Sequence, residues 1–247
     1  MRENEGDEDG FFGTLAGKIC LFFIPFIIAS FFLISLYIMM VDKSMFWIVG
    51  GGMFGYFFPP AGKESVIPLT VGALRSKYGL TPTVVITMVA TTIAFVDIVT
   101  SYFLLWNFYI AEKIPLIGKW IKRFEEFGAQ KMKEKEWISH IAFVGVALFV
   151  VFPFQGSGGV GASILGKVIG MDKYHAWIAI IIGAFSGCFL ISFVSYFLSG
   201  AVLSAFKSGL FQGIGVLAII IVFFIFLYFY FKNSANLKTK INKRLKI

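Results

Sequence analysis

The stretch FFPPAGKESVIPLTVGALRSKYG, residues 57–79, interrupts a chain that otherwise consists of long apolar runs. Two adjacent prolines, Pro59 and Pro60, shortly precede the charged pair Lys63 and Glu64, after which the chain returns to apolar residues. Prolines break helices, and charged side chains are costly inside a membrane. What this break means therefore depends on whether the neighbouring runs lie in a bilayer.

The composition indicates a membrane protein with several spanning helices. The 247 residues are 58% hydrophobic and only 15% charged, and 31 of them are Phe, which is outside the usual range of soluble globular domains. A spanning helix needs about 20 apolar residues. No Asp, Glu, Lys or Arg occurs in residues 19–41, 174–206 or 208–231, and Asp97 is the only one in residues 80–111. Four spanning helices are therefore predicted.

The two cysteines and the N-terminal residues fit this interpretation. Cys20 and Cys188 both lie inside apolar runs, where a thiol packs as a small hydrophobic group. Residues 1–18 are predicted to form an acidic N-terminal tail. The apolar run that follows them is too long for the core of a signal peptide, so we expect it to be retained as a helix.

Basic residues are concentrated in two segments. Residues 112–137 contain seven Lys or Arg against five acids, and residues 232–247 contain six against none. Nucleic acid is one partner for such segments, but beside spanning helices they are typical of cytoplasmic anchoring, and no nucleic acid is expected. Residues 113–137 have apolar side chains at helical spacing, which predicts an amphipathic helix on the cytoplasmic surface or one that binds a partner. Both chain termini are predicted to be cytoplasmic, in a multi-pass protein of the plasma membrane.

Two basic segments on one side require an even number of crossings between them. Three apolar stretches separate them, and the first, residues 138–172, contains FPFQGSGGVGASILG at residues 152–166. One proline and five glycines break a helix near its middle, and broken backbone at membrane depth must line protein or a watery cavity. Residues 138–172 are therefore predicted to be a re-entrant hairpin, which enters the membrane and returns to the same side.

An internal comparison extends this prediction to the first break. Shifting the sequence by 94 residues places SYFL at residues 101–104 on SYFL at residues 195–198. The same shift aligns Phe58, Pro59, Gly62, Val66 and Gly72 with Phe152, Pro153, Gly156, Val160 and Gly166. Residues 45–79 are thus predicted to be a second re-entrant hairpin that opens to the opposite side. The two halves would then be inverted repeats, the arrangement of many secondary transporters.

The predicted fold class is an all-α polytopic membrane protein, organised as a single membrane domain over residues 1–247. Each re-entrant hairpin is followed by a long spanning helix, and further spanning helices lie near both termini. The predicted spanning helices are residues 19–41, 80–112, 174–206 and 208–231, and residues 232–247 form a basic cytoplasmic tail. A homo-oligomer is compatible with this organisation.

Two acids are the candidates for proton or ion coupling. Glu64 follows the first proline break, and Asp97 lies midway along an uncharged run. An ionisable group at membrane depth costs on the order of 3 kcal/mol, so it requires a partner or a function. Lys63, Arg75 and Lys167 are the candidate cationic partners and substrate contacts. The alternatives are a buried ion pair that holds helices together and, for Arg75, a side chain that reaches to the interface.

The glycines at the two breaks are candidates for substrate binding. Helix N-termini that start after Gly62 and after Gly156 would point their positive dipole ends into a cavity. Gln155 and Ser157 could add side-chain donors, while the sequence QGSGG lacks the GK[ST] of a phosphate-binding loop. The residues expected to break the hairpins are Pro59, Pro60, Pro68, Pro153, Gly158 and Gly159.

Catalytic motifs are missing from the sequence. It contains no HExxH, no GxSxG and no cluster of Cys and His at metal-binding spacing. Its only histidines, His140 and His175, lie near the starts of apolar stretches, where an interfacial position is expected. We therefore expect a protein that is not an enzyme and that has no metal and no cofactor.

The two breaks resemble those of a known family. The segments PPAGKESVIPLTVGAL and FPFQGSGGVGASILGKVIGM, with YGLTPTVVITMVATT between them, are similar to the signature hairpins of the small multidrug export protein family and of the wider DedA superfamily. The resemblance covers about residues 45–206. For DedA-like proteins it implies proton-coupled translocation of polyprenyl-phosphate or other lipids, with Glu64 matching their first acid and Asp97 a second. Those proteins have arginines in the second hairpin region, where this chain has only Lys167.

The sequence leads to three hypotheses for function. The first is a proton- or ion-coupled flippase of an anionic or isoprenoid-phosphate membrane lipid, with the head group near Gly62 and Gly156. The second is a proton-coupled exporter of small cationic or amphipathic compounds, in which Glu64 and Asp97 bind the cation directly. The third is a scaffold that transports nothing, in which neutralising the two acids does no harm.

Overall fold

The computed structural model describes residues 14–40, 42–57, 62–112 and 136–198. Within these ranges the chain forms seven helices and no strand, as the apolar runs predict. The helices are α1 (Leu15–Met39), α2 (Lys43–Phe57), α3 (Lys63–Tyr78), α4 (Pro82–Glu112), α6 (Glu136–Val151), α7 (Gly159–Ile169) and α8 (Lys173–Phe197).

Three of these helices are long and apolar enough to cross a membrane. Their spanning parts are Ala16–Met39, Pro82–Ile110 and Lys173–Phe197. Only 6% of the apolar window of α1 is buried inside the protein, against half of the window of α4 and of α8. The three correspond to the predicted spanning helices 19–41, 80–112 and 174–206. The chain is therefore a multi-pass membrane protein.

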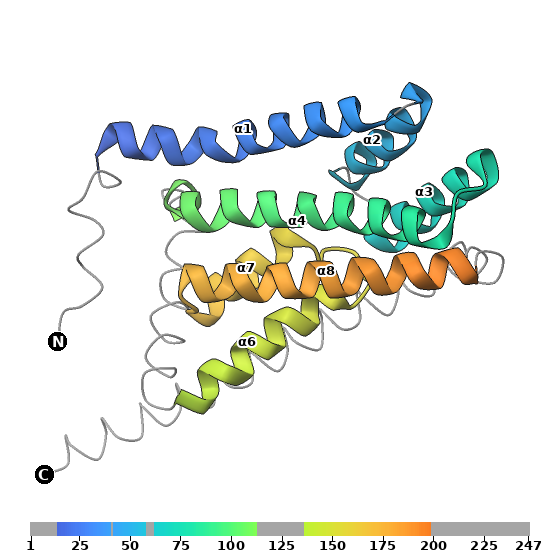
Figure 1. Ribbon diagram of the computed structural model, residues 1–247. Coiled ribbons are helices and arrows are strands. Elements are labelled where there is room, and N and C mark those ends of the chain that lie inside the picture. Colours follow the sequence, from blue (N-terminus) through green and yellow to red (C-terminus); the bar gives the residue numbers. More distant parts are fainter. Residues whose placement is uncertain (1–13, 41, 58–61, 113–135, 199–247) are drawn as a thin grey trace, which may run out of the picture.

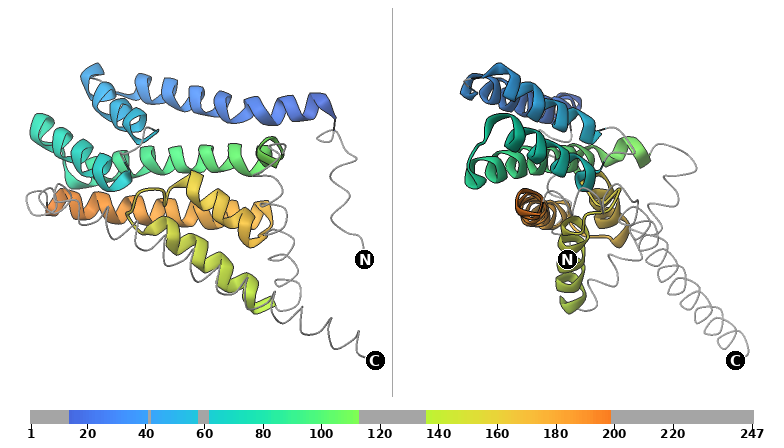
Figure 2. Two further views of the ribbon diagram at one scale, coloured as in Figure 1. Left: turned by 180° about the vertical axis from the view of Figure 1, so that it is seen from behind. Right: turned by 90° about the vertical axis from the view of Figure 1, so that its right-hand side faces the viewer.

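The long helices α4 and α8 lie side by side and run in opposite directions at the centre of the bundle (Figures 1 and 2). α1 packs along the face of α4 that is turned away from α8 (Figure 1). A face-to-face stack of Phe32 on Phe95, with ring centroids 3.8 Å apart, joins these two helices. The centre of the bundle is thus a helix pair that the remaining helices cover.

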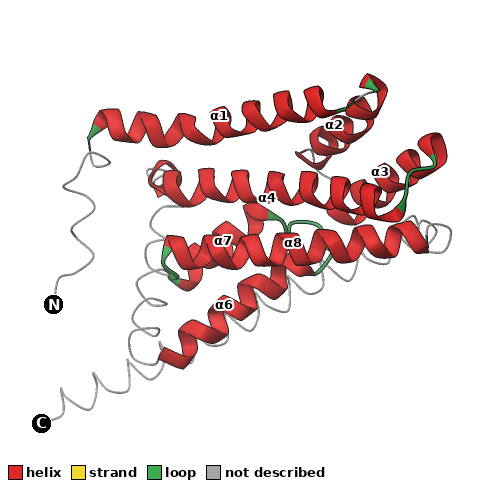
Figure 3. Ribbon diagram, viewed as in Figure 1, coloured by secondary structure: helices red, strands yellow, loops and turns green. Residues whose placement is uncertain are grey.

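The four shorter helices form two pairs, α2 with α3 and α6 with α7. In Figure 1 the two pairs enter the bundle from opposite ends, and both reach the middle of α4. The turn between α6 and α7, drawn as a green loop in Figure 3, ends at Gly158, the N-cap of α7. Gly62 is the N-cap of α3, and neither glycine has a side chain to cap its helix. Both α3 and α7 therefore begin inside the bundle with N–H groups at their N-termini that need partners from elsewhere in the protein.

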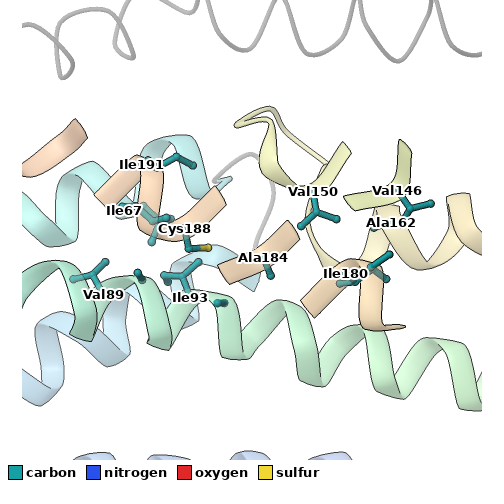
Figure 4. Packing of buried hydrophobic residues seen from close by; sticks show 14 of the residues in the cluster. Ile67, Val89, Ile93, Val146, Val150, Ala162, Ile180, Ala184, Cys188 and Ile191 are labelled. Atoms are coloured by element: carbon teal, nitrogen blue, oxygen red, sulfur yellow. The ribbon is translucent and has the colours of Figure 1, made fainter. Parts of the chain in front are cut away.

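The core consists mainly of Ile, Val and Ala side chains (Figure 4), and two glycines of α8 let a neighbouring helix approach closely. A Cβ added at Gly183 of α8 would come within 2.5 Å of the Ala147 carbonyl oxygen on α6, and one at Gly187 within 2.9 Å of the Val151 Cα. Small residues four positions apart are typical of tightly packed membrane helices. The backbones of α8 and α6 are therefore in close contact near the C-terminal end of α6.

One predicted breaking residue has a different position. Pro68 lies inside α3 and does not end the helix, so its predicted role as a hairpin breaker is wrong. A proline in the second turn lacks the N–H that would donate to the carbonyl of Glu64, yet α3 continues without interruption to Tyr78. Several predictions lie outside the described residues: Pro59, Pro60, the amphipathic segment up to residue 135, the helix 208–231 and the two terminal tails through residues 13 and from 232.

Candidate functional site

A cavity of about 390 Å³ lies where the two short helix pairs meet the middle of α4. Its volume is within the range of about 300–1,000 Å³ that is usual for small-molecule sites. It combines apolar walls with one carboxylate and a glycine-rich turn. The residues that line it are Tyr56, Phe57, Gly62, Val96, Asp97, Thr100, Gln155, Gly156, Gly158, Gly159, Val160 and Gly161.

Asp97 connects three helices at this cavity. Its Oδ1 accepts a hydrogen bond of 2.7 Å from the Tyr56 hydroxyl and one of 2.6 Å from the Gly159 backbone N–H, while its Oδ2 has no hydrogen-bond partner in the described structure. A carboxylate at the first turn of α7 interacts favourably with the positive end of the helix dipole. Asp97 therefore stabilises the start of α7, where the second helix pair is interrupted, and its Oδ2 is still available as a hydrogen-bond acceptor.

Lys63 makes the complementary contact at the other end of the same break. Its Nζ donates a hydrogen bond to the carbonyl oxygen of Val150, in the last turn of α6. The last carbonyls of a helix have no partner within the helix, and a cation is favourable there. Lys63 thus links the start of α3 to the end of α6, and its ammonium remains a buried positive charge beside the cavity.

Glu64 differs from the other two charged groups. Lys63, Glu64 and Asp97 are each only 1% exposed, yet neither carboxylate oxygen of Glu64 has a hydrogen-bond partner within the described part of the chain. Its carboxylate occupies the space that a Cβ on Gly62 would fill, so it lies directly behind a residue that lines the cavity. A buried charge without donors is unstable unless it takes up a proton or a cation. Glu64 is the group at this site with the greatest need for a ligand.

Glycines allow the second pair to approach α4 and α2. A Cβ on Gly159 would overlap the backbone carbonyl oxygen of Asp97, and one on Gly158 would overlap the Tyr56 hydroxyl. Gly156 has a φ of 88°, a conformation that other residues rarely adopt. The buried Ser157 stabilises the turn, because its hydroxyl donates a 2.6 Å hydrogen bond to the Phe152 carbonyl. Ser157 therefore holds the turn and does not line the cavity.

The structure gathers most of the sequence-predicted residues at this one place. Gly62, Asp97, Gln155, Gly156, Gly158 and Gly159 line the cavity, and Lys63, Glu64 and Ser157 are buried beside it. Two predicted substrate contacts lie elsewhere. Pro153 is in the turn between α6 and α7, as expected for a residue that interrupts the helix at the tip of the predicted hairpin.

Arg75 and Lys167 lie toward opposite ends of the bundle, away from the cavity. Arg75 is in the last turn of α3, where it donates a 2.6 Å hydrogen bond to the Tyr196 carbonyl and lies 4.9 Å from the centre of the Tyr196 ring. Lys167 is in the last turn of α7, 5.8 Å from the Phe108 ring centre. Both are positioned as helix C-terminal cations, which the helix dipole favours.

Sequence reasoning missed the two residues that bring hydroxyl groups to the cavity. Tyr56 lies just before the proline pair and supplies the hydroxyl that binds Asp97. Thr100 is one turn beyond Val96, and both line the cavity. A signal for Tyr56 was present, because a tyrosine in an apolar run beside a break brings a hydroxyl that needs a partner when buried.

The fold and the site together define a multi-pass helical membrane protein with a buried, charged cavity at the middle of its bundle. In the described ranges no three His, Cys, Asp or Glu side chains lie close enough together to hold a metal ion. Residues 64–190, just over half of the chain, match the family described as "Putative small multi-drug export protein". The chain belongs to this family, whose name indicates membrane export or transport. No curated protein and no solved structure matches it.

Proposed function

We propose that the protein is a proton-coupled exporter of small cationic or amphipathic compounds, with Glu64 as its main coupling group. One observation carries this proposal, namely that Glu64 is buried directly behind Gly62 of the cavity wall, with no hydrogen-bond partner for either carboxylate oxygen. Lys63 donates to Val150 and makes no hydrogen bond to this carboxylate, so Glu64 is stable when it is protonated or when a further cation binds its oxygens. Protons and a cationic substrate would therefore compete for the same oxygens, which is the basis of exchange transport.

Asp97 has a second, different role in this proposal. Its Oδ1 is occupied by Tyr56 and Gly159, so the carboxylate orients the start of α7. Its free Oδ2 adds a second acceptor for the substrate cation. We expect Asp97 mainly to position the site and Glu64 to exchange protons.

The architecture that supports transport is a pair of re-entrant hairpins in inverted repeats. The order α2, α3, α4 recurs as α6, α7, α8, and Lys43–Phe57 shifted by 94 residues falls within Glu136–Val151. The central helices of the two halves, α4 and α8, run in opposite directions (Figure 1). Broken helices that meet at the midplane of inverted repeats carry the substrate sites of secondary transporters.

The basic segments suggest how this unit lies in the plasma membrane. α4 ends and α6 begins at the same end of the bundle (Figure 1), and the basic residues 113–135 join them. By the positive-inside rule that end is cytoplasmic, and so is the start of α1 beside it. We propose that both termini are cytoplasmic.

An anionic-lipid flippase of the DedA kind is the second candidate. The N-termini of α3 and α7 and the buried Lys63 are features that attract an anionic head group. The geometry ranks this candidate below the exporter for two reasons. Lys63 already donates to Val150, and Arg75 and Lys167 lie away from the cavity.

Transport in proteoliposomes tests the exporter proposal. Radiolabelled butyltrimethylammonium is added outside liposomes whose lumen is acidic, so that outward proton flow drives uptake. We expect uptake by the native protein, and uptake at the level of protein-free liposomes for Glu64→Gln. Arg75→Gln is the matched control, because it lies on the same helix outside the cavity and should transport normally. Gradient-driven uptake by Glu64→Gln at the native rate would refute the proposal.

The charge of the transported substrate distinguishes the exporter from the flippase. Lys63→Met removes the buried cation and keeps both carboxylates, so the fraction of this variant that remains folded should lose translocation of an isoprenoid phosphate and keep uptake of the ammonium compound. If the native protein moves the isoprenoid phosphate and not the ammonium compound, the flippase is correct. If it moves neither, and Glu64→Gln with Asp97→Asn leaves a cellular phenotype unchanged, the scaffold hypothesis is favoured.

A further inference from the structure

A second cavity, of about 450 Å³, lies between α1, α2 and α4. It is lined almost entirely by apolar and aromatic side chains and by two adjacent glycines of α2. The lining residues are Ala29, Leu33, Phe46, Trp47, Gly50, Gly51, Met53, Phe54, Phe57, Phe95, Val96, Val99 and Thr100. No ionisable side chain belongs to this set, in contrast to the cavity at Asp97, so the second cavity suits a hydrocarbon group.

The missing side chains of Gly50 and Gly51 leave this space open. A Cβ added at Gly51 would have no atom within 4 Å, and one at Gly50 would contact only the Phe46 ring, at 3.8 Å. Gly50, Gly51 and Gly52 follow one another, and glycine in the interior of a helix costs about 0.5–1 kcal/mol relative to alanine, so the run needs a reason. Packing supplies that reason at Gly52, where a Cβ would overlap the Thr70 hydroxyl, whereas at Gly51 no helix of the described ranges comes within 4 Å of the Cβ position.

The two cavities share a wall. Phe57, Val96 and Thr100 line both of them. The Thr100 hydroxyl donates within its own helix, to the Val96 carbonyl at 2.6 Å, so the shared wall offers no free hydroxyl donor toward either side. A ligand with a charged end and an apolar end could thus lie with one end beside Asp97 and the other between α1 and α2.

We infer that the second cavity receives the hydrocarbon chain of an amphiphilic cation whose charged group lies in the first cavity. This inference rests on the proposed function and names its substrate class, a monovalent cation that carries an alkyl chain. Both cavities have volumes in the usual range for small-molecule sites. The competing occupant is an acyl chain of the bilayer, which would make no distinction between substrates of different chain length.

A chain-length series tests the inference. Binding of butyl-, octyl- and dodecyltrimethylammonium is measured in nanodiscs, with binding to empty nanodiscs subtracted. For the native protein we expect octyltrimethylammonium to bind at least about 30-fold tighter than butyltrimethylammonium, since each methylene removed from water contributes up to about fourfold. Gly51→Leu fills the second cavity and should reduce this ratio at least about tenfold, while the affinity for butyltrimethylammonium stays the same.

Gly55→Leu is the matched control. Gly55 lies one turn further along α2, has open space around its Cβ position and does not line the second cavity. The Gly55→Leu variant should keep the native ratio of the affinities for octyl- and butyltrimethylammonium. An unchanged ratio in Gly51→Leu would overturn the inference and leave the proposed function intact. Failure of the native protein to bind any of the three compounds would overturn the proposed function itself.

Photolabelling of the native protein tests the location without a variant. An octyltrimethylammonium with a diazirine at the chain end should label peptides from residues 29–33, 46–57 and 95–100, and excess unlabelled compound should prevent this. Labelling spread evenly over the apolar helices, or labelling that is not prevented by competitor, would contradict the inference.

Discussion

The two short helix pairs differ in what they bring to the middle of the bundle. The α2–α3 pair brings side chains, namely Tyr56, Lys63 and Glu64, whereas the α6–α7 pair brings backbone groups, the Val150 carbonyl and the Gly159 N–H. A broken helix exposes a negative and a positive dipole end inside the protein. Lys63 meets the first and Asp97 meets the second. The first half of the chain therefore neutralises the break of the second half.

This difference shows why the two halves are not interchangeable. Of the three buried charged residues in the described ranges, Lys63 contacts the C-terminal end of α6 and Asp97 the N-terminal end of α7. Glu64, the third, has no hydrogen-bond partner. Structural charges and a functional charge thus lie within one site. Substitutions in one helix pair at a time test this difference.

Lys63→Met should have the largest effect on stability. It leaves the Val150 carbonyl without its donor and removes the buried cation beside Glu64 and Asp97, at a cost of about 3 kcal/mol. Thermal unfolding can be followed through reaction of the buried Cys188 thiol with a maleimide dye in a Cys20→Ser background. Lys167→Met, the same change outside the cavity, should cost less than about 1 kcal/mol. Equal losses for both variants would contradict the role given to Lys63.

Gly159→Ala should have the next largest effect. The added Cβ would overlap the backbone carbonyl oxygen of Asp97, so α7 must move away from α4, at a cost of about 2 kcal/mol. The control is Gly145→Ala on α6, where a Cβ meets open space and should stabilise the helix by up to about 1 kcal/mol. The same dye assay compares the two. If Gly159→Ala unfolds no earlier than the native protein, the close approach of the second pair is not required.

Tyr56→Phe should have a moderate effect. It removes one of the two donors to Asp97 Oδ1, a hydrogen bond to a charged group worth about 1.5 kcal/mol. Tyr78→Phe provides the comparison, because it removes a hydroxyl contact with Ser44 at the end of the bundle and should cost about 0.5 kcal/mol. A reversed order in the unfolding temperatures would show that Tyr56 does not hold the site.

Arg75→Ala should have the smallest effect. The guanidinium is exposed and contacts the Tyr196 carbonyl and ring, so the expected loss of stability is below about 1 kcal/mol. Uptake of butyltrimethylammonium should stay at the native level because Arg75 does not reach the cavity. A strong loss of uptake in a variant that remains folded would place Arg75 in the transport path and would favour the anionic substrate.

Much of the site could be predicted because breaks and charges in an apolar run are local signals. The sequence pointed to Gly62, Asp97, Gln155 and Gly156, and these residues line one cavity. The prediction for Pro68 was wrong because a helix can continue through a proline in its second turn. Arg75 and Lys167 were predicted as substrate contacts but lie away from the cavity, because helix C-termini favour cations whether or not a ligand binds there.

The class of protein, the spanning helices within residues 14–198 and the two breaks follow from the amino-acid sequence alone, since hydropathy and helix-breaking residues act over a few turns. Which charges are already engaged depends on packing between distant segments. The contacts of Asp97 with Gly159 and of Lys63 with Val150 join residues 62 and 87 positions apart. They depend on how closely α8 holds α6 and how closely α7 approaches α4. Within the described ranges Glu64 is left as the buried acid without a hydrogen-bond partner, because packing places Lys63 and Asp97 at the helix ends of the second pair.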